Sequence, residues 1–495
     1  MAETIPVTAR AGNMLKQEIF TESPTSTESG SAPSTPSSSA ALEQTKFERV
    51  QVESAHFTPK QAPPSLESLP VEIKILILKE IPDWATLKSF LVLFQSFFPA
   101  YNLAKREVLC CILQTQFGPL LGEAIAAVRS CGLYLETHKE EAITLLDTWR
   151  RSDEIKKLDP NSSSRIDNPC DMEEIMNLFR LHEVLQFFLQ DFVKTIPQPQ
   201  WMELDEWTNS KFPIKLSSSE QYRFLRALCR LQTHANIIGR AEYPLDEPVC
   251  GSPFRNNWRD NETDGPFSPE EEAYRLFFGT IPPWECDEMG CVWTYLKTKV
   301  DPLYPEVRDS SSKLMKDHGL GDDAWFEELP LDAQPPYWGL LKSLTSLENL
   351  DASTGSLVAI GPNFVYRLLH ATPLIRRDMV LSNADYMENT FIGDNSRVNI
   401  EPEDKLPLIY PADRYAVSGF EEMWSYSDLS PTQKPNIAWR MVSLLPHSPE
   451  DNLESVIIQD DEVGWDWYHA LWDDDRLNEW GCLRLWTKRE PWSLL

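Results

Sequence analysis

The sequence predicts a mainly α-helical protein in which a disordered N-terminal tail precedes two folded parts. Three observations carry this prediction. Apolar residues recur at the helical period through most of the chain, helix-capping residues precede several of these segments, and clean period-two strand patterns are scarce. The chain has 495 residues, of which 42% are hydrophobic and 17 are Trp, so it can bury a sizeable core.

Residues 1–64 form the predicted tail. They contain the tract TESPTSTESGSAPSTPSSSA, which is rich in Ser, Thr and Pro and offers almost nothing apolar to bury. A segment of this composition cannot offset the conformational entropy that folding removes. We therefore expect this tail to be disordered.

Residues 65–115 are predicted to form three short helices that are apolar around most of their circumference. Ser68 can cap the first helix, Pro82 ends it, and Asp83 can cap the second. The third helix is expected to begin near Tyr101. Three short helices cannot hide so many apolar side chains from water by themselves. Either the rest of the chain or another protein must cover them.

Residues 116–495 are predicted to form one large, mostly helical domain with few strands. In two segments a capping residue is followed three positions later by Glu, at Asp171–Glu174 and at Ser217–Glu220. Apolar residues then recur at helical spacing in both segments. The best strand candidate is ESVIIQ, at residues 454–459.

Six Trp residues crowd the C-terminal end of the chain, among many acidic residues. They are Trp465, Trp467, Trp472, Trp480, Trp486 and Trp492. The interpretation that we favour is that these rings pack into the core of the helical domain. The alternative is an acidic, aromatic-walled groove that would bind a basic peptide through cation–π contacts.

The composition excludes several classes of partner. The formal net charge is -30 and the Lys and Arg residues are scattered, which argues against nucleic acid and against anionic membranes. No apolar run approaches the roughly 20 residues of a membrane helix, and the amino terminus lacks the apolar core of a signal peptide. The nine Cys residues are an odd number, which favours reduced thiols over a disulfide framework. We expect an intracellular protein, cytoplasmic or nuclear.

No enzymatic motif stands out in the sequence. A P-loop, an H-E-x-x-H helix and a G-x-S-x-G elbow are all missing. Cys286 and Cys291 are spaced too widely for a usual zinc knuckle, and the acidic run Asp473–Asp475 is typical of a solvated surface. We therefore expect no catalytic residue, no cofactor and no metal.

The opening apolar stretch carries a resemblance. Residues 69–98, LPVEIKILILKEIPDWATLKSFLVLFQSFF, resemble an F-box: a Leu-Pro opening, a run of Ile and Leu, a Pro-Asp break and a leucine-rich second helix. The continuation is similar to the third helix of F-box-like proteins of filamentous fungi. The later segments RALCRLQTHANIIGR (226–240) and ALWDDDRLNEWGCLRLW (470–486) are similar to segments that accompany this F-box in that group. On this resemblance, residues 65–115 form a three-helix F-box-like module.

In that family the F-box docks on a Skp-type adaptor, which links it to a cullin-RING ubiquitin ligase, and the remaining domain captures the substrate. The resemblance implies six adaptor-binding residues: Leu69, Pro70, Ile73, Ile77, Leu87 and Leu91. The sequence departs from the family pattern at two places. Lys74 stands where an apolar residue is common, and Gln95–Phe98 replaces a Cys-Lys-x-Trp type of ending.

The resemblance implies that this chain is the substrate-receptor subunit of a Skp–cullin–F-box ubiquitin ligase. Such a subunit tethers a target protein for ubiquitination and performs no chemistry of its own; the target cannot be identified from the sequence. The alternative is a non-catalytic scaffold whose F-box-like helices are covered internally and bind no adaptor. Exposure of the Leu69, Pro70, Ile73 and Leu87 side chains distinguishes the two interpretations.

Overall fold

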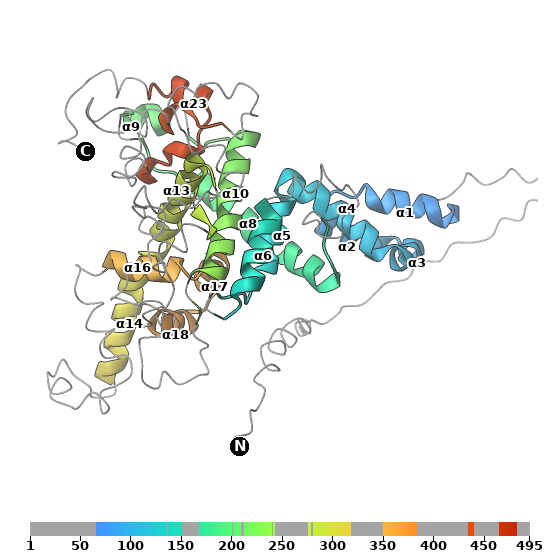
Figure 1. Cartoon of the computed structure of the whole chain (residues 1–495), viewed down its shortest axis with the longest axis horizontal. Coiled ribbons are helices and arrows are strands. Elements are labelled where there is room, and N and C mark those ends of the chain that lie inside the picture. Colours follow the sequence, from blue (N-terminus) through green and yellow to red (C-terminus); the bar gives the residue numbers. More distant parts are fainter. Residues whose placement is uncertain are drawn as a thin grey trace, which may run out of the picture. The chain divides into compact units, whose positions relative to one another are not determined.

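In the computed structural model every described residue belongs to one compact unit, Pro64–Leu495. The described residues are 66–135, 137–150, 168–199, 201–208, 212–239, 241–242, 276–278, 281–317, 350–383, 434–439 and 465–482. Every regular element within these ranges is a helix (Figure 1), which confirms the mainly-α prediction. The predicted tail and the strand candidate at 454–459 lie outside the described residues.

The stretch from Leu66 to Phe117, here called the N-terminal module, contains four α-helices and two short 3-10 turns. They are η2 (Leu66–Ser68), α1 (Val71–Lys79), α2 (Trp84–Leu93), η3 (Gln95–Phe97), α3 (Phe98–Leu103) and α4 (Lys105–Phe117). Helix α1 packs against both α3 and α4 (Figure 1). The single helix predicted from Tyr101 onward is thus two helices, because Ala104 leaves the helical conformation with φ −118 and ψ 24.

Capping explains where the first two helices begin. Asp83 caps α2 as predicted: its Oδ1 accepts the Thr86 backbone N–H at 2.8 Å and its Oδ2 accepts the Thr86 hydroxyl at 2.7 Å. The predicted cap at Ser68 is wrong, because Ser68 belongs to turn η2 and α1 begins after Pro70. Pro70 is the N-cap residue of α1, with φ −53 and ψ 151, and it makes no side-chain capping bond.

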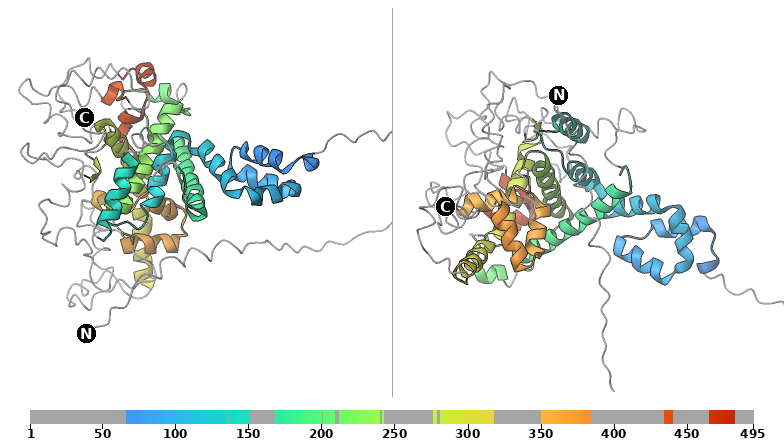
Figure 2. Two further views of the ribbon diagram at one scale, coloured as in Figure 1. Left: turned by 45° about the vertical axis from the view of Figure 1, so that its right-hand side comes forward. Right: turned by 90° about the horizontal axis from the view of Figure 1, so that it is seen from below.

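The remaining described helices form the helical domain. They are α5 (Leu121–Arg129), α6 (Lys139–Arg150), α8 (Met172–Thr195), α9 (Leu204–Glu206), α10 (Ser218–Ile237), α13 (Pro283–Val300), α14 (Leu303–Asp317), α16 (Leu350–Val358), α17 (Pro362–His370), α18 (Pro373–Asn383) and α23 (Asp474–Glu479). Helix α10 packs against α5, α8, α13 and α17, and α13 also packs against α14 and α16 (Figure 2). Helices α10 and α13 therefore form the centre of the domain.

The two predicted capping signals are both used. At α10 the capping box is complete: the Glu220 N–H donates to Ser217 Oγ at 3.1 Å, and the Ser217 N–H donates to Glu220 Oε2 at 2.9 Å. At α8 the Asp171 carboxylate accepts the Glu174 N–H at 2.8 Å. These interactions satisfy N–H groups that have no partner within the helix itself.

The Trp-rich C-terminal end packs into the core, as the favoured interpretation expects. Its 3-10 turns η12 (Trp465–Trp467) and η13 (His469–Leu471) contact α13. Three of its rings are buried: Trp465, Trp472 and Trp480. Trp467 is half-buried, and Trp486 and Trp492 lie outside the described residues. The buried rings line no open groove, so the groove alternative is wrong for them.

One helical stretch, Lys105–Arg129, is long and apolar enough by length and composition to cross a membrane, which the sequence analysis did not expect. Half of its most apolar window is buried inside the protein. Gly118, at φ +51, also separates α4 from α5 within this stretch. Only glycine adopts this conformation at no steric cost.

Candidate protein-docking surface

Exposed apolar side chains are concentrated on the N-terminal module. Thirteen large apolar side chains are exposed among the described residues, and nine of them lie between positions 66 and 103. These nine are Leu66, Val71, Ile73, Leu76, Val92, Leu93, Phe94, Phe98 and Leu103. Single exposed apolar residues are ordinary on a protein surface, whereas a concentration of them marks an interaction site.

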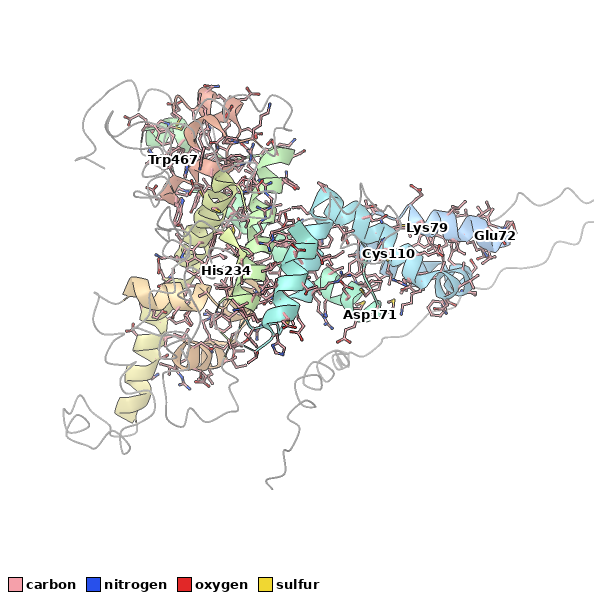
Figure 3. The ribbon with its side chains drawn as sticks, viewed as in Figure 1. Glu72, Lys79, Cys110, Asp171, His234 and Trp467 are labelled. Atoms are coloured by element: carbon pink, nitrogen blue, oxygen red, sulfur yellow. The ribbon has the colours of Figure 1, made fainter. Side chains whose placement is uncertain are left out.

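Helix α1 has apolar residues on two faces. One face turns inward, where Leu78 is fully buried and Ile77 packs against the core. The other face turns outward, with Ile73 exposed by 42% and Leu76 by 57%. A helix that is apolar on both faces is typically covered on both, so the outer face of α1 is a candidate contact surface. Figure 3 labels Glu72 and Lys79 near the two ends of this helix.

The six residues predicted to bind an adaptor do not share one environment. Pro70 and Ile73 are exposed, as the prediction requires. Three others are half-buried: Leu69, Ile77 and Leu91. Leu87 is fully buried, so it is corrected from a surface contact to a core residue.

The burial of Leu87 follows from the face of α2 on which it lies. Trp84 and Leu91 stand three residues before it and four after it, and both pack against the core. The Trp84 ring stacks on Phe179 of α8 at 5.2 Å between ring centroids. This face of α2 therefore turns inward, and Leu87 at its centre has no access to a partner.

The outer face of α2 contains none of the six predicted contact residues, although this helix was expected to be apolar around most of its circumference. Val92 and Leu93 are each exposed by 75%, more than any other large apolar side chain among the described residues. They lie off the stripe that contains Trp84, Leu87 and Leu91. The signal that could have found them is an apolar residue outside the main stripe of an amphipathic helix.

The corner between α2 and α3 is made of aromatic rings. Phe90 lies 4.7 Å from Phe94 and 4.9 Å from Phe97 between ring centroids. Phe97 is fully buried, whereas Phe94 and Phe98 are exposed by 37% and 52%. Such ring pairs add about 0.5–1.5 kcal/mol each beyond the area that they bury. The exposed rings therefore stand on a well-packed base.

Lys74 connects three parts of the module. Its ammonium group donates to the backbone carbonyl of Glu67 in η2 at 2.9 Å and to that of Ser96 in η3 at 3.2 Å. The same group lies 5.5 Å from the centroid of the Phe97 ring. The side chain is half-buried. Lys74 thus lies within the module rather than on its outer face.

The charges of the module are balanced. Residues 66–117 contain five acidic and five basic residues, whereas the whole chain has a formal net charge of -30. One exposed pair joins Lys79 of α1 to Glu107 of α4 at 2.7 Å, and the hydrogen bond from Lys79 holds the pKa of Glu107 below its usual value. Association at this surface would therefore depend on apolar contact more than on electrostatic attraction.

A thiol, an imidazole and a carboxylate come together elsewhere, in the core. Cys291 Sγ lies 3.9 Å from His469 Nδ1, and His469 Nε2 lies 3.7 Å from Asp287 Oδ2. Thiol hydrolases use these three groups in this order. Here Cys291 and His469 are fully buried, and burial raises the pKa of the Cys291 thiol well above its ordinary value. The thiol is therefore protonated and inaccessible, and the group is part of the core.

Comparisons of the chain with protein-family models, with curated proteins and with solved structures found no match. Within the described ranges, no group of three or more His, Cys, Asp and Glu side chains is arranged to hold a metal ion. The exposed apolar surface of the N-terminal module is therefore the feature on which a functional argument can be built.

Proposed function

We propose that the chain is the substrate-receptor subunit of a Skp–cullin–F-box ubiquitin ligase. The N-terminal module docks on a Skp-type adaptor, and the helical domain binds a protein target. One observation carries the proposal: exposed apolar side chains are concentrated on the stretch that resembles an F-box.

The energetics of covering this surface are favourable. Each large apolar side chain that a partner buries contributes roughly 1.5–3 kcal/mol. Four or five of them contribute on the order of 10 kcal/mol before the costs of association are subtracted. The remainder is sufficient for a micromolar or tighter complex. A surface of this kind, with balanced charges, fits a stable protein partner.

The mechanism of such a subunit is tethering. A target that is held near the ubiquitin-charged enzyme reacts at a high effective concentration, with no chemistry supplied by the receptor. The eight described Cys residues are free thiols, which fits the reducing cytoplasm or nucleus. The exposed positions Pro70 and Ile73 support the family's mode of docking, in which the first helix contacts the adaptor.

The rival interpretation is a scaffold that binds no adaptor. The burial of Leu87 agrees with it, since part of the F-box-like stripe is covered by the chain itself. The exposure of Leu76, Val92 and Leu93 disagrees with it, since these side chains have no cover among the described residues. Direct binding to an adaptor decides between the two.

The test is the affinity of the full chain for a purified Skp-type adaptor, with two matched variants. Ile73→Asp places a charge on the outer face of α1, where Ile73 is exposed by 42%. Ile375→Asp makes the same change on α18, where Ile375 is exposed by 46%. Both helices begin next to a proline, Pro70 and Pro373, so the two changes have similar local settings.

We expect Ile73→Asp to weaken adaptor binding by roughly tenfold to a hundredfold, the loss of one buried apolar side chain. Ile375→Asp should leave the affinity unchanged. A wild-type chain that does not bind the adaptor would overturn the proposal in favour of the scaffold. Equal affinities of the two variants would move the contact away from α1.

A further inference from the structure

The position of Lys74 raises a question that the proposed function does not answer. It stands on α1 where F-box sequences commonly have an apolar residue, yet its ammonium group points into the module. It donates to carbonyls of Glu67 and Ser96, which lie 7 and 22 residues away along the chain. One side chain of α1 therefore links two turns, η2 and η3, that are separated along the chain by α1 and α2.

We propose that Lys74 is a positioning residue that fixes the docking surface by holding the Leu66–Pro70 turn against the corner between α2 and α3. The part of this inference that concerns adaptor binding depends on the proposed function. The part that concerns the order of the turn does not.

The bond from Lys74 can be compared with the backbone bond within the turn. Within η2 the backbone bond from the Leu69 N–H to the Leu66 carbonyl is long, at 3.5 Å. Leu66 is exposed by 52%, so burial does little to anchor this end of the module. The Lys74 bond to the Glu67 carbonyl is shorter, at 2.9 Å, and hydrogen bonds from a charged donor are stronger than neutral ones. Lys74 is therefore the stronger link.

The second acceptor of Lys74, the Ser96 carbonyl, lies in a well-packed part of the module. Ser96 lies in η3 beside Phe97, whose ring is fully buried and lies under the Lys74 ammonium group. A cation above an aromatic face is attracted by the ring's quadrupole. The ammonium group is thus anchored on the packed corner and reaches outward to the Glu67 carbonyl. It is the turn, and with it Leu69 and Pro70, that gains order.

An ordered turn matters for docking because binding then costs less conformational entropy. An apolar residue at position 74 could add contact area but could not bond two carbonyls. Lys74 in place of an apolar residue therefore gives up contact area with the partner. In return it orders the opening pair, Leu69 and Pro70.

The test uses the full chain and three variants. Lys74→Met keeps the length of the side chain and removes the donor, and Lys74→Arg keeps a donor. Lys88→Met is the matched control: Lys88 is an exposed lysine on α2 that lies 5.4 Å from the Trp84 ring centroid. Hydrogen exchange is measured on peptides that cover residues 66–73, 94–98 and 105–117, and adaptor affinity is measured with a purified Skp-type adaptor.

We expect Lys74→Met to accelerate exchange of the Leu69 amide, whose N–H bonds to the Leu66 carbonyl within residues 66–73, by about tenfold, which corresponds to one charge-assisted hydrogen bond. Residues 105–117 should be unchanged, as should the thermal midpoint. Adaptor binding should weaken several-fold. Lys74→Arg should restore both the exchange rate and the affinity, which a residue that merely filled space would not do, and Lys88→Met should resemble the wild type.

Three failures are distinguishable. Unchanged exchange in Lys74→Met overturns the positioning role whether or not the adaptor binds. Accelerated exchange in a chain whose wild type does not bind the adaptor supports the positioning role and overturns the proposed function instead. Accelerated exchange with unchanged adaptor affinity overturns the role of Lys74 in docking.

Discussion

At the scale of single residues, His234 shows how the core controls a titratable group. It lies on α10 and is buried against Phe277 and Phe278, at 5.4 and 5.1 Å between ring centroids (Figure 3). Its Nε2 has no hydrogen-bond partner among the described residues. Burial lowers the pKa of this imidazole to about 4, because an apolar surrounding disfavours the charged form.

This pKa predicts a loss of stability in mild acid. Between about pH 6.5 and pH 4 the unfolded chain binds a proton at His234 that the folded chain does not, so the free energy of unfolding falls as the pH falls. From pH 7 to pH 5 the loss from this group is about 2 kcal/mol. In His234→Phe this pH-dependent loss of unfolding free energy should disappear. Thermal midpoints of the two chains at pH 7 and pH 5 check this; parallel pH curves would contradict it.

The predicted contact residues show what periodicity can and cannot decide at this scale. It predicted one stripe of Trp84, Leu87, Leu91, Phe94 and Phe98. The structure places the first three on one inward face of α2, whereas Phe94 is the C-cap of that helix and Phe98 begins α3. Periodicity could not decide which face turns inward, because α2 is also apolar at Val92 and Leu93. The assignment of Leu87 to the surface came from the F-box resemblance, and the structure places Leu87 in the core.

At the scale of helices, α10 and α13 are joined by buried charges. Arg226 bonds to Glu285 and to Glu288, each at 2.6 Å, and Arg230 bonds to Glu285 and to Glu123 of α5. Burial raises the pKa of Glu288 to about 7 despite the nearby Arg226. Burial also acts to raise the pKa of Glu285, but its two arginines outweigh burial and lower it. Each of these buried groups therefore needs its oppositely charged partners to stay ionised in the core.

Removal of one partner should therefore be costly. Arg226→Met leaves Glu288 in the core without its principal donor, and a buried ion pair that loses one partner costs about 3–5 kcal/mol of folding free energy. The matched control is Arg367→Met, since Arg367 pairs with Glu242 at the surface and is exposed by 54%. Exposed pairs contribute about 1 kcal/mol or less.

Denaturant unfolding of the wild type and both variants measures the difference. The prediction fails if Arg226→Met unfolds at the same denaturant concentration as Arg367→Met.

The same two helices show which elements a sequence can predict. The capping box at Ser217 and Glu220 was predictable because its two residues are three positions apart. The buried arginines were not. Apolar periodicity marked a face with Leu225, Leu228 and Leu231, and nothing local required the arginines to be buried. Their partners stand 55 to 107 residues away in the chain, so only the assembled fold brings them together.

At the scale of the whole described unit, the two regions rich in aromatic residues differ in exposure: one is the N-terminal module and the other is the C-terminal segment 465–482. The C-terminal segment 465–482 seals itself against the helical domain: Arg476 bonds to Glu220 of α10 at 2.6 Å, and Asp473 bonds to Arg223 at 2.8 Å. The N-terminal module keeps nine exposed apolar side chains. The chain thus covers one apolar region and leaves the other accessible. That difference supports a partner at the module, and it could not be read from composition alone, since both regions are rich in large apolar residues.

The packing of the C-terminal segment also includes one very close approach. The Trp465 ring lies directly against Gly290 of α13: a Cβ added at Gly290 would stand 2.1 Å from Trp465 Cε2. Trp465 is buried, and its Nε1 donates to Asp287 Oδ1 at 3.1 Å, so the ring has little freedom to move away. We expect Gly290→Ala to displace the ring and to lower the free energy of unfolding by about 1–3 kcal/mol, the usual cost of overpacking a core.

Gly355 of α16 provides the control. A Cβ at Gly355 would meet only Trp293, at 3.8 Å, which is ordinary van der Waals contact. Gly355→Ala should therefore be neutral or stabilising by up to about 1 kcal/mol, because alanine favours the helix more than glycine does. Denaturant unfolding and the fluorescence of the buried tryptophans distinguish the variants: only Gly290→Ala should unfold earlier and shift the emission of the folded state to the red. Equal stabilities would show that the C-terminal segment is not closed on α13 at this position.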